Sequence, residues 1–93
     1  MRTPLSKEEI DGALENLDGW SFGNDRLTKS FQFDDFRSAI AFIVRLAFEA
    51  EDLDHHPTLE NVYNRVDLAL NTHDAGGKVT GTDVELATRI DAL

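Results

Sequence analysis

The hydrophobic positions change their spacing several times along this chain of 93 residues, and each change predicts a new element. Near the N-terminus, Ser6 and Glu9 form a capping-box pattern, in which each side chain can bond the other residue's backbone N–H. The apolar residues that follow are spaced as one helical stripe: Ile10, Ala13, Leu14 and Leu17. Gly19 can end this helix. We therefore predict a first helix that begins after Ser6.

A β-hairpin is predicted next. The stretches WSF and RLTKSFQF flank Gly-Asn-Asp at residues 23–25, which is a turn signal between two strands. In the second stretch, Leu27, Phe31 and Phe33 lie on one face, as the two-residue period of a strand requires. This face is expected to contact the core.

A long helix is predicted after the hairpin. Asp34 or Asp35 can cap its N-terminus, and Pro57 prevents it from continuing. Its predicted buried stripe consists of Phe36, Ala39, Ile40, Ile43, Ala47, Ala50 and Leu53.

The period returns to two over residues 61–71, where Asn64 interrupts the apolar face of a predicted third strand. A turn at residues 74–78 and a short strand at residues 78–80 follow. The closing helix begins at about Thr82, with Val84, Ala87 and Ile90 as its stripe. The order α-β-β-α-β-β-α predicts one α+β domain over residues 1–93, with helices packed on one face of a four-stranded antiparallel sheet.

Composition narrows the function classes. The chain carries 18 acidic and 9 basic residues, a net charge of −9, which argues against nucleic acid as a direct ligand because phosphate-binding surfaces need clustered Lys and Arg. It has no cysteine, which excludes disulfides, a thiolate zinc site and a cysteine nucleophile. No segment resembles a signal peptide or approaches about 18 consecutive apolar residues. We therefore expect a cytoplasmic protein that does not enter membranes.

All three histidines fall in the second half of the chain, among carboxylates. His55 and His56 lie at the predicted end of the long helix, and His73 lies at the exit of the following strand. Glu51 precedes His55 by four residues, so the two share a helical face and can pair. Asp74 follows His73 and precedes a glycine turn that would let a flat ligand approach the backbone. Histidines beside carboxylates suit acid–base chemistry near neutral pH.

Each of these residues also has a structural interpretation. Adjacent histidines after a helix often form a polar cap, and a single histidine commonly begins a loop. Asp83 completes a capping box with Thr80, and Tyr63 alternates with core residues as on a sheet face. Three histidines with a carboxylate could hold zinc, but the usual His-x-His or His-x₃-His spacing is missing, so no metal is expected.

Taken together, Glu51, His55-His56-Pro57, Tyr63, His73 and Asp83 resemble the signature of the pterin-4a-carbinolamine dehydratase family. That signature is an acidic residue, three intervening positions, His-His-Pro, an aromatic residue, a further histidine and an aspartate. Four other stretches also look like the corresponding family segments: LDGW at 17–20, FQFDDFRSAIAFI at 31–43, NVYNRVDLAL at 61–70 and DVELATRID at 83–91. The resemblance covers essentially the whole chain.

The resemblance implies the same element order and a hydro-lyase that needs no metal or redox cofactor. The family dehydrates 4a-hydroxytetrahydrobiopterin to quinonoid dihydropterin and water, during tetrahydrobiopterin recycling. By this resemblance, His55 and His73 are the acid–base pair, and His56 binds and orients the pterin. Glu51 would hold His55, and Asp83 would support the site. The other implied pterin-binding residues are Pro57, Thr72, Asp74 and Ala75.

The tripeptide Thr58-Leu59-Glu60 departs from the family, because many members carry an acidic residue and a bulky aromatic after His-His-Pro. The identity of the pterin is therefore open. The alternative function is a dimerising protein-binding module that keeps the fold, since the vertebrate member doubles as a dimerisation cofactor of a homeodomain transcription factor. A related activity on another pterin is a further alternative.

Two more expectations concern assembly and folding. The small core and the unpaired edges of strands at residues 26–33 and 61–71 predict a homodimer or homotetramer, formed by edge pairing or helix packing. The three histidines lie at the ends of elements, so we expect that replacing them does not disturb the fold.

Overall fold

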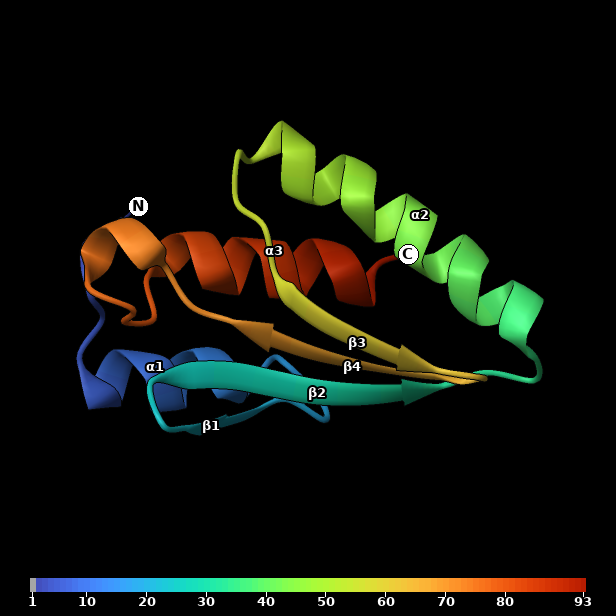
Figure 1. The fold of residues 1–93 in the computed structure, drawn as a ribbon. Helices are drawn as coiled ribbons and strands as arrows, with labels where there is room; N and C mark the ends of the chain where they lie inside the picture. Colours follow the sequence, from blue (N-terminus) through green and yellow to red (C-terminus); the bar gives the residue numbers. More distant parts are fainter. Residues whose placement is uncertain (1) are drawn as a thin grey trace.

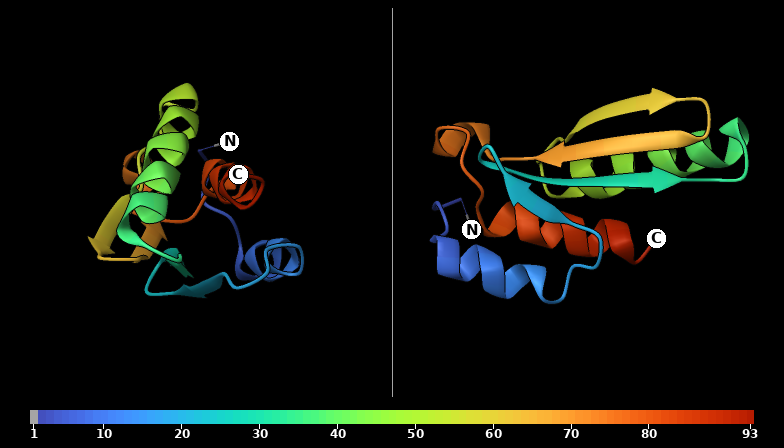
Figure 2. Two further views of the ribbon diagram at one scale, coloured as in Figure 1. Left: turned by 90° about the vertical axis from the view of Figure 1, so that its right-hand side faces the viewer. Right: turned by 90° about the horizontal axis from the view of Figure 1, so that it is seen from below.

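The computed structural model describes residues 2–93 and confirms the predicted order of elements (Figure 1). The elements are α1 (Lys7–Leu14), β1 (Ser21–Gly23), β2 (Arg26–Gln32), α2 (Phe36–Asp52), β3 (Thr58–Val62), β4 (Arg65–Leu70), the 3₁₀ turn η1 (His73–Ala75) and α3 (Gly81–Asp91). The antiparallel sheet has the order β1-β2-β4-β3, and the three helices lie on one of its faces (Figure 2). Within residues 2–93, no helix has both the length and the apolar character needed to cross a membrane.

The helix starts and the first turn follow the local pattern of the sequence. Ser6 and Glu9 form the predicted capping box, and Asp35 caps α2 by accepting from the Ser38 N–H at 2.7 Å. The first hairpin turns at Asn24 and Asp25, whose φ values are 52° and 59°, as a two-residue turn between twisted strands requires. These predictions are confirmed, although α1 ends at Leu14, earlier than expected.

The second half of the sheet differs from the prediction. Residues 61–71 do not form one strand, because the chain reverses at Tyr63 and Asn64 and makes a hairpin of β3 and β4. Tyr63 has a φ of 53°, and the Asn61 side chain donates to Arg65 O at 2.9 Å across the turn. The expected strand at residues 78–80 is also wrong, since that segment makes only isolated bridges. The edges of the sheet are therefore β1 and β3, while β2 and β4 are central.

The core lies between the sheet and the helices, and it shows which side of α2 is buried. The buried side chains of α2 are Ala39, Phe42, Leu46 and Ala50. The predicted stripe was partly wrong, because Phe36 and Ile40 are 50% and 36% exposed and Ala47 is also exposed. The helix carries apolar residues on two sides, and only packing against β4 and α3 decides between them.

Candidate active site

The end of α2 determines the surroundings of the first two histidines. The helix stops at Asp52, and Asp54 adopts a left-handed conformation with a φ of 49°. The His55 N–H donates to Ala50 O at 2.9 Å, which ties the turn to the helix end. After this turn the two rings separate: His55 is 5% exposed, whereas the side chain of His56 is 62% exposed.

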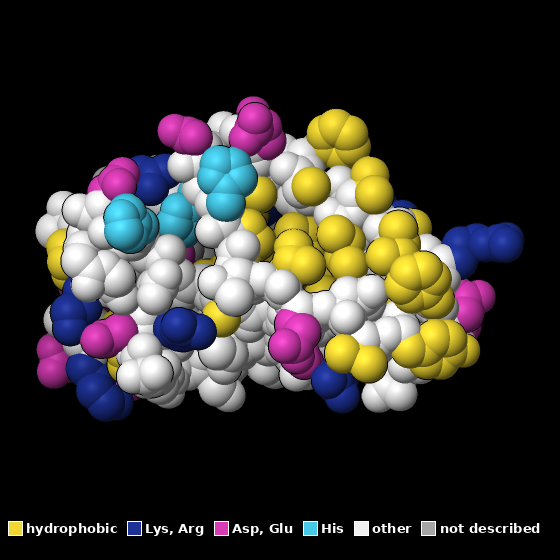
Figure 3. Space-filling view, in the orientation of Figure 1, with side chains coloured by type: hydrophobic (Ala, Val, Ile, Leu, Met, Phe, Trp, Pro, Cys, Tyr) yellow, Lys and Arg dark blue, Asp and Glu magenta, His cyan; other side chains and the backbone are white. Residues whose placement is uncertain are grey.

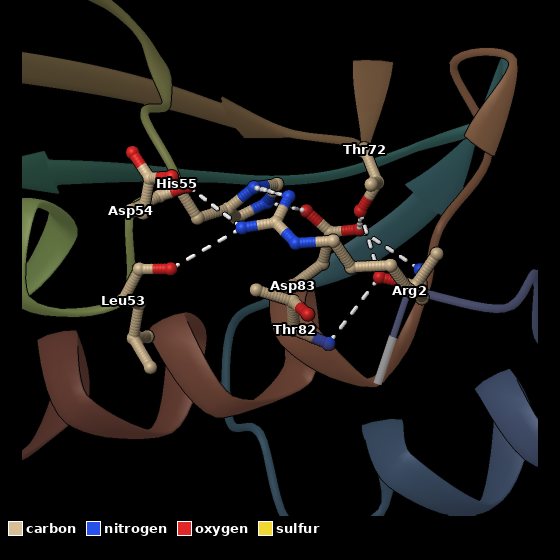
Figure 4. Close-up of polar contacts among 8 residues, drawn as sticks. Arg2, Leu53, Asp54, His55, Thr72, Thr82 and Asp83 are labelled. Carbon is tan, nitrogen blue, oxygen red and sulfur yellow. Dashed lines mark hydrogen bonds and ion pairs between the residues drawn. The ribbon is translucent and has the colours of Figure 1, made fainter. Parts of the chain in front are cut away.

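His55 contacts a carboxylate that sequence spacing does not link to it. Its Nε2 lies 2.5 Å from Oδ1 of Asp83, a residue with no solvent exposure (Figure 4). The premise that His55 occupies no buried position is therefore wrong, because its ring is buried and is the partner of a buried carboxylate, so we now expect its replacement to disturb the fold. The ring is held rigidly, which is what a positioned proton-transfer group requires.

Asp83 is held from the other side by two threonines. Its Oδ2 accepts from the Thr80 N–H at 2.9 Å and from the Thr72 hydroxyl at 2.8 Å. The hydroxyls of Thr72 and Thr80 are 2.7 Å apart. Asp83 thus completes the predicted capping box of α3, which confirms the structural interpretation, and it also contacts His55. Among residues 2–93, every buried side-chain nitrogen and oxygen has a hydrogen-bond partner.

Glu51 pairs with His56 and not with His55. Its Oε1 lies 2.8 Å from His56 Nε2. The prediction that Glu51 holds His55 is wrong, because the left-handed turn at Asp54 removes His55 from the helical register that an i,i+4 pair needs. The Glu51 and His56 side chains are 76% and 62% exposed, so this pair orients a ring at the surface and contributes little stability.

His73 comes from a different part of the chain, at the start of η1. The preceding Thr72 is fully buried, and its N–H donates to Lys78 O at 2.8 Å, which closes the loop. Gly76 and Gly77 have φ values of 73° and 76°, which glycine adopts without strain. The loop is therefore anchored at its base, while the His73 side chain is exposed.

The three histidines border one open cleft of about 470 Å³. The cleft is lined by Arg2, Asp54, His55, His56, Thr58, Asn71, His73 and Asp74. On the face drawn in Figure 3, the histidine side chains gather at one end of the molecule, beside acidic residues. The volume is in the range of small-molecule sites, and the lining is polar and charged.

The cleft includes part of the predicted site and adds residues to it. Four of the predicted residues line it: His55, His56, His73 and Asp74. Glu51 and Asp83 are not in the lining, but each contacts one of the histidines. Pro57, Thr72 and Ala75 are also absent from the lining. The sequence did not single out three of the lining residues: Arg2, Asp54 and Asn71. Arg2 lies more than fifty positions before the histidines, so no spacing pattern connects it to them.

This arrangement supports proton transfer. One imidazole is fixed by a buried carboxylate, and a second imidazole stands on another loop beside the same cleft. Histidine exchanges protons near neutral pH, and a carboxylate partner fixes both its orientation and its tautomer. Within residues 2–93, no three His, Asp or Glu side chains are grouped so that they could hold a metal ion.

Known proteins match this chain over nearly its whole length. Residues 3–93 match the family described as Pterin 4 alpha carbinolamine dehydratase. The chain belongs to this family. A protein of Opitutus terrae named "Putative pterin-4-alpha-carbinolamine dehydratase" is 52% identical over 93 residues, which cover 100% of this chain and 96% of that protein. A protein of a Bradyrhizobium species with the same name is 52% identical over 91 residues, covering 96% and 91% of the two chains.

Solved structures of relatives share the fold. A crystal structure from Brucella melitensis, described as a transcriptional coactivator/pterin dehydratase, superposes with a TM-score of 0.92 at 41% identity and covers 97% of both chains. A pterin dehydratase-like protein, described as a RuBisCO assembly factor in the alpha-carboxysome, has a TM-score of 0.67 at 25% identity and covers 80% of this chain and 87% of its own. Proteins with a similar fold are therefore also described by other roles.

Proposed function

We propose that this protein is a hydro-lyase that converts 4a-hydroxytetrahydrobiopterin to quinonoid dihydropterin and water. In this reaction the N5–H bond gives up its proton, the C4a–O bond breaks, the hydroxyl leaves as water and a C4a=N5 double bond forms. The observation that carries the proposal is the cleft in which His73 and the carboxylate-bound His55 meet, in a chain of the dehydratase family. Both bond changes need a proton donor or acceptor beside the ring, and the two imidazoles supply them.

The geometry supports distinct roles for the three histidines. Asp83 contacts Nε2 of His55, so we assign proton exchange with a ligand in the cleft to Nδ1, which lies 3.4 Å from Nη1 of Arg2. His73 is the second proton-transfer group, on the loop that follows β4. His56, held by Glu51 at the surface, binds and orients the pterin ring.

A dehydration assay tests the proposal. The carbinolamine is generated in situ by an aromatic amino acid hydroxylase, and formation of the quinonoid product is followed by absorbance with and without the purified protein. Because the carbinolamine also dehydrates spontaneously, the expected result is a rate above that background that rises in proportion to protein concentration. A rate equal to the background at micromolar protein would reject the dehydratase function.

The second candidate function is a dimerising protein-binding module, and an apolar surface favours its dimerisation. Phe36, Ile40, Val44 and Phe48 recur every four residues along α2 and are 50%, 36%, 50% and 71% exposed. We call these four residues the α2 patch. Hydrophobic side chains gather over α2 on the face shown in Figure 3. An apolar patch of this kind marks an interaction surface. A negative dehydration assay on the intact protein would favour this second candidate.

We propose that the partner on the α2 patch is a second copy of the chain, in a homodimer or homotetramer. A substitution of Phe48 by Asp places a charge in the patch and is expected to reduce the oligomer toward the chain mass of 10.4 kDa, because the charge would have to be desolvated at the interface. Multi-angle light scattering measures this mass directly.

The matched control is Leu93→Asp, which changes another exposed apolar residue, 43% exposed, at the C-terminus and outside the α2 patch. This variant is expected to keep the mass of the wild type. A wild-type mass of 10.4 kDa at micromolar concentration would contradict the homo-oligomer.

A further inference from the structure

The N-terminal segment places the side chain of Arg2 in the candidate active site. The Leu5 N–H donates to Val79 O at 2.9 Å, and Pro4 forms an antiparallel bridge with Thr80. Thr80 is the residue that caps α3, only three positions before Asp83. The segment therefore runs beside the start of α3, and Arg2 reaches the end of the molecule where Asp83 and His55 meet (Figure 4).

Arg2 makes three contacts there, all with the turn that follows α2. Its Nη2 donates to Asp54 O at 2.7 Å and to Leu53 O at 3.2 Å, and its Nη1 lies 3.4 Å from Nδ1 of His55. Carbonyl groups at the end of a helix lack partners within the helix, and a cation is favourable beside them. The two contacts with carbonyl groups hold the guanidinium in place. The third contact, between Nη1 of Arg2 and Nδ1 of His55, follows from that placement.

The contact with His55 has only one chemically acceptable form. A guanidinium carries five N–H donors, accepts no hydrogen bond and keeps its proton in proteins. Nδ1 of His55 must therefore be the acceptor, without a proton of its own. The ring proton then lies on Nε2, where the carboxylate of Asp83 accepts it at 2.5 Å.

We propose that Arg2 is a positioning residue that fixes His55 in the tautomer with the proton on Nε2 and with Nδ1 unprotonated, so that Nδ1 can accept a proton when a ligand in the cleft takes the place of the Arg2 contact. Asp83 alone also favours this tautomer over the other neutral one, but it accepts still more strongly from a doubly protonated ring, in which Nδ1 carries a proton and cannot act as a base. Arg2 opposes that form, because two donors would then face each other. A fall in kcat on loss of Arg2 is expected only if the proposed dehydratase function is right, whereas the tautomer of His55 does not depend on that function.

The experiment compares the wild-type protein with Arg2→Met, which removes the donors but keeps a long side chain. Long-range ¹H–¹⁵N spectra at neutral pH report which ring nitrogen carries the proton, and the His55 signals are assigned by elimination, from the signals lost in His56→Ala and in His73→Ala. In the wild type we expect a protonated Nε2 and an unprotonated Nδ1. In Arg2→Met we expect the Nδ1 signal to shift toward the protonated form, and kcat to fall by roughly 10- to 100-fold.

The control is Arg26→Met, which removes an exposed arginine at the start of β2, and it is expected to leave both the ring signals and kcat unchanged. A wild-type His55 with its proton on Nδ1, or unchanged His55 signals in Arg2→Met, would overturn the proposal. Neither of these two results from the spectra depends on dehydratase activity. An inactive wild type would therefore reject the proposed function, and the spectra would still test the role of Arg2.

Discussion

Replacement of Asp83 by alanine is expected to lower the free energy of unfolding by about 3–5 kcal/mol, a large fraction of the stability of a domain of this size. Asp83 has no solvent exposure, and its two oxygens accept from Thr80, Thr72 and His55. Alanine would leave the His55 ring and the Thr80 N–H without this partner in the interior, whereas the Thr72 hydroxyl could still donate to the Thr80 hydroxyl 2.7 Å away. Each unpaired buried donor costs about 1–3 kcal/mol before water or local movement relieves it. Urea denaturation followed by circular dichroism measures the change.

Two further variants show whether the effect comes from the buried network. Asp52→Ala removes an exposed carboxylate, the partner of Arg89 at 2.7 Å, and is expected to change stability by less than about 1 kcal/mol. Asp83→Asn keeps the size of the side chain but cannot accept from both the His55 ring and the threonines. It is expected to be more stable than the alanine variant and nevertheless to lose activity. An Asp83→Ala protein with wild-type stability would contradict the role of this network in the fold.

Replacement of His73 by alanine is expected to lower kcat by roughly 10²-fold, while the fold and the unfolding free energy stay unchanged. His73 is exposed and its loop is anchored through the backbone of Thr72, so the side chain carries no core contact. A general acid or base contributes about 10²–10⁴-fold, and the lower end applies because the carbinolamine already dehydrates unaided. Steady-state kinetics with in situ substrate, together with a circular dichroism spectrum, separates catalytic loss from unfolding.

His56→Ala is the matched control, because it removes another exposed imidazole beside the same cleft. We expect it to raise KM and to change kcat little, since it removes a binding contact.

His55→Gln combined with His73→Ala is expected to be little worse than the poorer single variant, because the two groups act in one step. A folded His73→Ala protein that dehydrates the carbinolamine at the wild-type rate would contradict the assignment of His73.

The sequence by itself determined the features that depend on neighbouring residues. The capping boxes at Ser6 and Thr80 and the turn at Asn24 all involve groups within a few positions of one another. Their hydrogen bonds form whenever the local backbone does, so the residue types and their spacing are enough. The family signature likewise predicts the three histidines and Asp83 as site residues from their types and spacing alone.

The tertiary structure alone decided which of these groups meet. Glu51 lies four residues before His55, yet the left-handed turn at Asp54 sends His55 to Asp83, 28 positions away, and leaves Glu51 to His56. Arg2 reaches His55 across 53 positions because Leu5 is bonded to Val79. Periodicity reports which face a residue takes within its own element. Contacts between distant residues depend instead on how the elements pack against one another. A spacing in sequence carries no information about that packing.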